Sequence, residues 1–293
     1  MTDLIWLTND HLSAAINPFG AELTHLRDAD GAELMTDADP AFWPKHAPVL
    51  FPVIGMTHSG TIRVDGRDYP MSKHGFARDR MFAVVEQDAT SVVFALAADA
   101  ETQASYPFDF EVRLHFALDG ATLRVTATIV NRDPDRPLLA QFGFHPAFAW
   151  PLPYGAPRSD HRIVFDRDEP GRLREIAPDG LIAAATADSP LEGRTLHLAD
   201  ALFAHDALVW DPVESDAVTY GGATGGRLRV QFPNTPALGI WTKPGAAFLC
   251  IEPWHGIADP EGFAGEFRDK PGVFEVAPGG EKRIMMNVTV EPR

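Results

Sequence analysis

The sequence predicts an all-β protein built from large packed antiparallel sheets, with few short helices. Three observations lead to this fold class. Many segments alternate apolar and polar residues at a period of two, which is typical of strands with one buried face. Residue pairs that tolerate positive φ separate these segments, as in hairpin turns. The 25 prolines and 24 glycines are scattered between them, and sustained helical periodicity is hard to find, so we expect roughly 15 to 20 strands.

Turn signals divide the first part of the chain into strands. Asp30-Gly31 interrupts the segment HLRDADGAELM, and Asp65-Gly66 interrupts TIRVDGRDYPM. Aspartate and glycine accept the backbone angles of tight hairpin turns. Each segment therefore predicts two strands joined by a short turn.

The clearest hairpin is predicted in the middle of the chain. Residues 111–118 and 122–130 both alternate apolar and polar side chains, and Asp119-Gly120 lies between them. Gly279-Gly280 predicts a turn before a last alternating strand. The other strands that the pattern indicates lie at 227–232, 238–243 and 248–252.

Nothing in the sequence divides the chain into separate units. We find no linker, charge block, low-complexity tract or repeat, and the Pro-rich stretch 151–160 has the composition of a surface excursion. Residues 40–46 and 260–269 are the two places where a turn or two of helix is expected. We predict a single domain, residues 1–293.

The charge and cysteine content exclude several classes of protein. The formal net charge is -16, which argues against a nucleic-acid binder and against adsorption to anionic membranes. Cys250 is the only cysteine, so no internal disulfide is possible. The N-terminal residues lack the pattern of a signal peptide, and no apolar run approaches a membrane span. A cytoplasmic location is therefore expected.

Two titratable residues stand in apolar, aromatic settings. His145 lies in QFGFHPAF, among phenylalanines, and Glu252 ends the apolar run of FLCIEPWHGIAD. Burying either group costs free energy unless it is hydrogen-bonded or used. An acid and a histidine that are both buried could carry general acid–base catalysis. They lie 107 positions apart, so only the folded sheet could bring them together.

Each of the other candidate residues could equally have an ordinary structural role. His74 could be a satisfied core histidine, and Arg78 could form an ordinary ion pair with Asp79. His255 and Asp259 read as exposed loop residues. The sequence has no HExxH, CxxC, GxGxxG, P-loop or GxSxG motif.

Five segments together resemble the aldose 1-epimerase (galactose mutarotase-like) family, in particular its LacX-like bacterial branch. They are APVLFPVIG, SKHGFARD, FGFHPAF, HDALVWD and FLCIEPWHGIAD, and the resemblance covers roughly residues 5–290. It implies a β-supersandwich, no cofactor or metal, and interconversion of the α and β anomers of a free aldose. It also implies that His145 is the general acid and Glu252 the general base. The same resemblance implies that sugar-binding residues are His74, Arg78, Asp206 and Trp254.

The chemistry of anomer exchange fits such a pair. A base takes the proton of the C1 hydroxyl while an acid protonates the ring oxygen, and each such group contributes about 10²- to 10⁴-fold. Apolar walls would raise the pKa of a carboxylate toward neutrality. We expect His145 and Glu252 to face each other across a pyranose-sized gap.

One departure from the family pattern bears on substrate binding. Relatives often carry Arg after the FPxxG segment, where this chain has Met56, and Arg78 or Lys243 could replace that cation.

The expected partner is a small sugar, and the expected assembly is a monomer or homodimer. Alternatives that remain open are a non-catalytic sugar-binding protein, a metal site of His74, His145 and Glu252, and, less favoured because it needs two carboxylates, a glycosidase.

Overall fold

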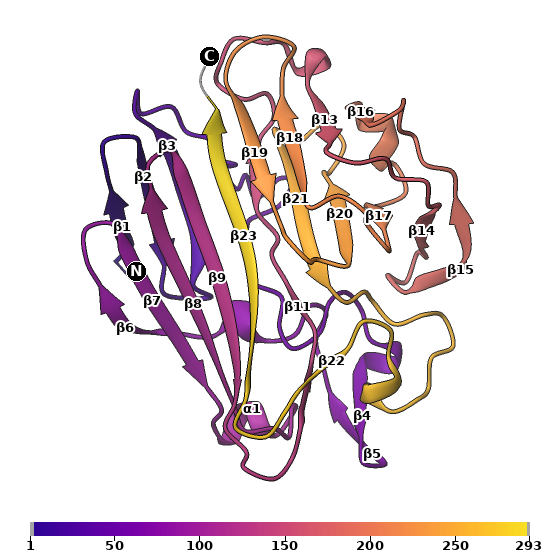
Figure 1. The fold of residues 1–293 in the computed structure, drawn as a ribbon. Coiled ribbons are helices and arrows are strands. Elements are labelled where there is room, and N and C mark those ends of the chain that lie inside the picture. The colour runs from indigo at the N-terminus through magenta and orange to yellow at the C-terminus, as the bar shows by residue number, and fades with distance from the viewer. Residues whose placement is uncertain (1–2, 292–293) are drawn as a thin grey trace.

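The computed structural model describes residues 3–291, and over that range the chain forms 23 strands, one α-helix and five short 3-10 helices. The all-β prediction is confirmed, with more strands than expected. No helix in this range is long and apolar enough to cross a membrane. Two large antiparallel sheets dominate the molecule, and three small sheets complete it (Figure 1).

The larger sheet has nine strands and contains the predicted central hairpin. Its strand order is β16-β13-β18-β19-β23-β9-β8-β7-β6. Its apolar positions alternate with exposed ones, most regularly in β8 and β9. The strands are β6 (Ala83–Gln87), β7 (Ser91–Ala97), β8 (Phe110–Asp119), β9 (Thr122–Asn131), β13 (Arg162–Phe165), β16 (Thr195–His197), β18 (Ala217–Gly221), β19 (Arg227–Gln231) and β23 (Glu281–Glu291).

The second large sheet has seven strands and carries the residues of interest for function. Its order is β11-β21-β20-β17-β14-β15, and β12 also pairs with β21. Strand β21 lies between β20 and the short strands β11 and β12 and is buried over nearly its whole length, which explains why its sequence is an apolar run rather than an alternation. The strands are β11 (Phe142–Gly143), β12 (Ala147–Ala149), β14 (Leu173–Ile176), β15 (Ile182–Ala187), β17 (Leu208–Trp210), β20 (Ala237–Trp241) and β21 (Phe248–His255).

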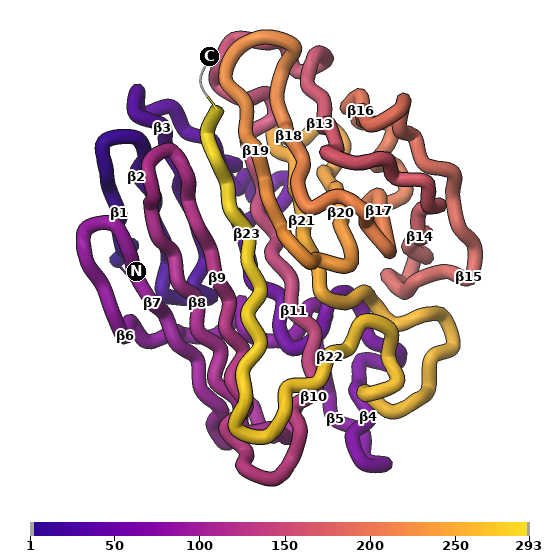
Figure 2. The backbone as a smooth tube through the Cα atoms, viewed as in Figure 1, coloured from indigo at the N-terminus to yellow at the C-terminus, as the bar shows by residue number. Residues whose placement is uncertain are grey.

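Three small sheets pack around the large ones. In Figures 1 and 2 the three strands β1 (Ile5–Thr8), β2 (Leu12–Asn17) and β3 (Glu22–Asp28) lie behind β7, β8 and β9. One apolar cluster joins residues of this sheet to residues of both large sheets, so the layers share a core. The remaining pairs are β4 (Thr61–Val64) with β5 (Arg67–Pro70), and β10 (Leu138–Ala140) with β22 (Phe274–Val276).

The turns agree with the sequence in part. Asp65 and Gly66 both have positive φ, 51° and 76°, and they join β4 to β5 as predicted. The central hairpin turns one residue later than predicted, because Asp119 pairs with Thr122 and leaves Gly120 and Ala121 as the turn. Gly279 also has positive φ, but the strands on either side of it pair with different partners.

The helical expectations were mostly wrong. Residues 40–46 form no helix, and only one turn is present, in which the backbone N–H groups of Phe42 and Trp43 donate to the carbonyl of Asp39. Within 260–269 the only helix is the 3-10 turn η5 (Phe267–Asp269). The α-helix that the sequence did not signal is α1 (Ala100–Gln103), which begins with a capping box formed by Asp99 and Thr102. The other 3-10 turns are η1 (His58–Gly60), η2 (Ala77–Asp79), η3 (Arg158–Asp160) and η4 (Asp200–Phe203).

Candidate active site

The sheet register brings His145 and Glu252 together. Gly143 pairs with Trp254 and Ala147 pairs with Cys250, so the chain between β11 and β12 runs antiparallel to β21 without a shift in register. The N–H of Phe144 donates to the carbonyl of Pro253, and that of Ile251 donates to Pro146. His145 therefore lies opposite Glu252, as a cross-strand neighbour. A separation of 107 positions becomes a direct contact.

The two side chains touch without forming a hydrogen bond. Nε2 of His145 lies 3.1 Å from Oε2 of Glu252, and both side chains are buried, with exposed fractions of 9% and 2%. Neither Oε2 of Glu252 nor Nδ1 of His145 has a hydrogen-bond partner within residues 3–291. The expected pyranose-sized gap is therefore wrong. The strand register places the two groups side by side, at one end of a common cavity.

Burial favours the uncharged form of both groups. It raises the pKa of the Glu252 carboxyl well above its usual range, and the nearby Asp206 carboxylate acts in the same direction. Burial lowers the pKa of His145 to about 3, and Arg78 and Lys73 also oppose a positive charge there. Such opposite displacements from ordinary values are typical of acid–base pairs in enzymes.

His74 reaches the same place through a strained backbone. Its φ is 67°, a region that costs a residue with a side chain free energy. Its backbone N–H donates to the carbonyl of Gly55, and the N–H of Gly55 donates to Nδ1 of the ring. Nδ1 is therefore an acceptor, and the proton of the neutral ring is on Nε2. Burial, followed by the neighbouring His145, lowers the pKa of His74 well below its ordinary value, so the ring offers a neutral N–H donor.

Aromatic rings form the walls around the pair. The ring of Trp43 stacks on His145 with 4.9 Å between centroids, and Trp241 lies edge-on to it at 6.0 Å. Trp254 lies between two glycines: a Cβ at Gly143 or at Gly239 would come within 2.7 Å of the indole. The two glycines thus make the space that this tryptophan fills.

Sequence reasoning did not select Trp43 or Trp241 as functional residues. Trp43 falls in a segment where a helix is expected, and Trp241 in an ordinary strand. A signal for Trp241 is present, because residues 239 and 241 alternate along β20 and share the face that Glu252 and Cys250 occupy on β21. Trp43 lies in an irregular loop, and no local pattern marks it.

All six predicted site residues line one cavity of about 230 Å³. Arg78 is half-buried, and its Nη2 donates to the carbonyl of Lys73, 2.8 Å away. Asp206 is exposed at the cavity mouth, and Lys73 is also part of the lining. Lys243 is not part of it, since its Nζ lies against the carbonyl of Phe42. Lys243 therefore does not supply the positive charge that relatives often carry on an arginine at the position of Met56.

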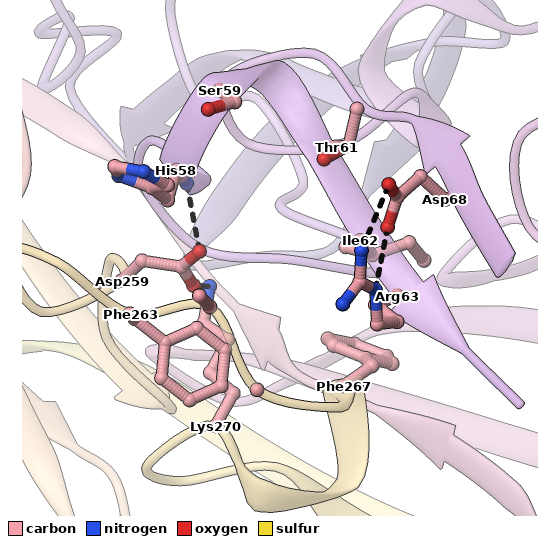
Figure 3. A pocket seen from close by; sticks show the side chains of 12 residues that line it. His58, Ser59, Thr61, Ile62, Arg63, Asp68, Asp259, Phe263, Phe267 and Lys270 are labelled. Atoms are coloured by element: carbon pink, nitrogen blue, oxygen red, sulfur yellow. Dashed lines mark hydrogen bonds and ion pairs between the residues drawn. The ribbon is translucent and has the colours of Figure 1, made fainter. Parts of the chain in front are cut away.

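His255 and Asp259 are not exposed loop residues, contrary to expectation. His255 ends β21 and is half-buried, and Asp259 is buried and paired with the equally buried Lys270, with Oδ1 2.9 Å from Nζ. The other carboxylate oxygen of Asp259 accepts a hydrogen bond from the backbone N–H of His58 (Figure 3). The backbone of Asp259 also bonds to Met56 and Ile182. This residue thus anchors the loop next to Gly55 and beside a second cavity of about 200 Å³.

The residues that could hold a metal ion differ from those proposed on sequence grounds. His74 is not one of them. Within residues 3–291, donor atoms of His145, Cys250 and Glu252 all lie within 4.8 Å of one another, and all three residues are buried. Cys250 therefore takes the place of His74 in any such cluster.

The chain matches a known protein family over most of its length. Residues 3–270 match the family described as Aldose 1-epimerase. The chain is 30% identical to the chromosomal protein LacX of Lactococcus lactis subsp. lactis, over 98% of this chain and 99% of that protein.

Two solved structures are similar over nearly their whole length. A galactose mutarotase related enzyme from Lactobacillus acidophilus is 28% identical, with a TM-score of 0.90 over 99% of this chain and all of that one. A galactose mutarotase-like protein from Lactobacillus casei ATCC 334 is also 28% identical, with a TM-score of 0.91 and the same coverage.

Proposed function

The chain belongs to the aldose 1-epimerase family, and from that premise we propose that it interconverts the α and β anomers of a free aldose, with His145 and Glu252 as the acid–base pair. One observation carries the proposal. The two groups touch at the end of a cavity but form no hydrogen bond with each other. Oε2 of Glu252 thus lacks a protein donor, and a sugar hydroxyl in the cavity would supply one.

Side-by-side placement suits the reaction better than a gap would. The anomeric hydroxyl oxygen and the ring oxygen are both bonded to C1, so the two atoms that exchange protons are close neighbours. Glu252 takes the proton from the hydroxyl while His145 gives one to the ring oxygen, and the C1–O5 bond breaks to leave an open aldehyde. Rotation about C1–C2 and reclosure, with the two roles reversed, gives the other anomer.

His145 and Glu252 together hold one exchangeable proton throughout this cycle. In the free protein, burial favours the neutral arrangement, with the proton on Glu252 and an unprotonated His145. Ring opening starts from the ionic arrangement, with a carboxylate beside an imidazolium. Sugar hydroxyls supply hydrogen bonds that stabilise the carboxylate, and Lys73 lowers the pKa of Glu252 in the same sense.

The cavity walls fit a pyranose. The indole of Trp254 offers an apolar surface to the C–H face of the sugar at low entropy cost. His74, Arg78 and Asp206 present polar groups around the same volume, and these we assign to hydroxyl recognition. The volume of about 230 Å³ suits a small sugar more than an oligosaccharide.

The experiment that tests this proposal is polarimetry of freshly dissolved α-anomers of several hexoses. We expect faster mutarotation with the protein than in buffer, and loss of that acceleration in the double variant Glu252→Gln, His145→Ala. Equal rates with and without protein for every sugar would exclude catalysis on those sugars. Activity that survives the double substitution would contradict the residue assignment.

A non-catalytic sugar-binding protein is the second candidate. The observation that favours it is Met56, which stands where relatives often carry an arginine. Calorimetry that detects sugar binding, together with polarimetry that detects no turnover, would support it. We further propose that the chain acts as one domain, residues 1–293, in the cytoplasm, as a monomer or homodimer.

A further inference from the structure

The face of β21 that carries Glu252 also carries a thiol. Side chains alternate along a strand, so Cys250 and Glu252 point to the same face. His145 lies opposite Glu252, and Ala147 lies opposite Cys250. His145 is therefore the diagonal neighbour of Cys250. One antiparallel strand pair thus brings a nitrogen, a sulfur and an oxygen donor together.

The spacing of these donors is close to that of metal ligands. One donor atom from each residue lies within 4.8 Å of the others, and Nε2 of His145 is 3.1 Å from Oε2 of Glu252. Nitrogen and oxygen ligands of a tetrahedral zinc ion are about 3.4 Å apart, from bond lengths near 2.0–2.2 Å. The imidazole and the carboxylate are already close to ligand spacing, and the thiol lies within 4.8 Å of both.

Two buried polar atoms of this cluster lack protein partners. Nδ1 of His145 and Oε2 of Glu252 are buried and have no hydrogen-bond partner in the described part of the chain. Most buried polar atoms in folded proteins are paired, so the unpaired Oε2 of Glu252, which faces Nε2 of His145, indicates a third participant. A sugar hydroxyl is one such participant, and a cation is another.

We propose that His145, Cys250 and Glu252 form a binding site for a borderline-soft divalent metal ion of the zinc type. Thiolate, imidazole and carboxylate together are a donor set for Zn²⁺, which commonly takes three protein ligands and leaves a fourth position open. His145 and Glu252 line the cavity, so that fourth position faces it. The bound ion occupies the two groups that exchange protons with the sugar. Inhibition of mutarotation by the ion follows, and this consequence rests on the proposed function, whereas the metal site itself does not.

Cobalt(II) tests the site directly. Cys250 is the only cysteine of the chain, so a thiolate-to-cobalt charge-transfer band can arise from no other residue. We expect this band in the near ultraviolet when Co²⁺ is added to the metal-free protein, and its loss when Zn²⁺ is added. The band should be absent from Cys250→Ala. Zinc affinity in that variant should fall by at least the roughly 10- to 100-fold that loss of an outer-sphere partner costs.

Two controls check that the band and the zinc affinity come from this site. His197→Ala removes an exposed histidine that lies near Glu192 on the surface, and it should keep the band. Cys250→Ser is a second variant without the thiol. Circular dichroism of both cysteine variants shows whether each one folds, so that loss of the band is not mistaken for unfolding. Absence of the band at millimolar Co²⁺, or unchanged zinc affinity in both cysteine variants, would overturn the proposal. A protein that shows the band without mutarotase activity keeps the metal site and loses the proposed function.

Discussion

Two buried acid–base contacts lie near the loop around Gly55, and they differ in what else their residues bind. The contact between His145 and Glu252 is 3.1 Å long, and that between Lys270 and Asp259 is 2.9 Å. Asp259 also accepts a backbone N–H and bonds through its own backbone to the neighbouring chain. The facing atoms of both contacts, Oε2 of Glu252 and Oδ1 and Nζ of the second pair, have no hydrogen-bond partner within residues 3–291. The difference therefore lies at Oδ2 and at the backbone of Asp259.

The difference separates a structural anchor from a site. A carboxylate that binds backbone groups holds one conformation, because each bond fixes a different part of the chain. A carboxyl group that has no backbone donor and faces an uncharged imidazole can exchange a proton with a ligand. We therefore expect substitutions in the first pair to change activity with little effect on stability, and substitutions in the second to do the reverse.

The largest expected effect is on catalysis. Glu252→Gln should reduce the mutarotation rate constant by about 10²- to 10⁴-fold, because the variant cannot accept the hydroxyl proton. The buried carboxyl is favoured in its protonated form, so the amide of the same shape should cost little stability. Polarimetry and urea unfolding measure the two quantities. A large loss of stability with retained activity would reverse our assignment of the two pairs.

The next largest effect is on stability. Lys270→Met should lower the free energy of unfolding by about 3–5 kcal/mol, because it leaves the buried carboxylate of Asp259 without its cation. Adding Asp259→Asn should recover much of that loss. Urea unfolding of the single and double variants measures this.

A matched control for the anchor is a surface pair. Arg63 and Asp68 form an ion pair whose side chains are 44% and 51% exposed. Arg63→Ala should cost no more than about 1 kcal/mol. A loss as large as that from Lys270→Met would mean that burial does not distinguish the two pairs.

The wall around the site should be sensitive to added volume. Gly239→Ala places a Cβ within 2.7 Å of the Trp254 indole, so we expect a destabilisation of about 1–3 kcal/mol and a weaker apparent affinity for sugar. Gly171→Ala is the control, because nothing lies within 4 Å of a Cβ there. Urea unfolding and the KM of mutarotation test the difference. Equal effects in both variants would indicate a backbone cause rather than a clash with the indole.

The smallest net effect in the parent protein comes from two opposite pH dependences, because they partly cancel. The pKa of His145 is lowered from 6.5 to about 3, so the unfolded chain binds more protons between these values and this contribution to stability is lost as the pH falls. The pKa of Glu252 is raised above 4.5, so the folded protein holds the extra proton and its contribution is lost as the pH rises through the folded pKa. Each slope is at most about 1.4 kcal/mol per pH unit.

Single variants should separate the two slopes. Between pH 4.5 and 6.5 the contributions of His145 and Glu252 oppose each other. Relative to the parent protein, Glu252→Gln should lose stability more steeply toward acid, and His145→Gln should lose it more steeply toward neutral pH. Urea midpoints measured across this range provide the test. Parallel pH profiles in the three proteins would contradict the opposite shifts.

Local sequence patterns predicted most of the fold. Alternation marked the hairpin of β8 and β9, and Asp65-Gly66 marked the turn between β4 and β5, because strand periodicity and positive φ are properties of short stretches of chain. The helix expected at 40–46 is absent because local patterns do not determine the structure of this segment. Its residues have no strong local preference, and contacts with distant residues, such as that of Trp43 with His145, decide their path.

The sequence by itself determined the fold class and identified His145 and Glu252 as polar groups in apolar surroundings. The resemblance of the chain to its family supplied their roles as general acid and general base. Those roles stay predictions, and so does the assignment of a single domain. Only the tertiary structure decided that the two residues touch, that Cys250 joins them, and that Asp259 is a buried anchor. These facts depend on strand register, which is set by pairing between segments more than 100 positions apart. No local pattern contains that information.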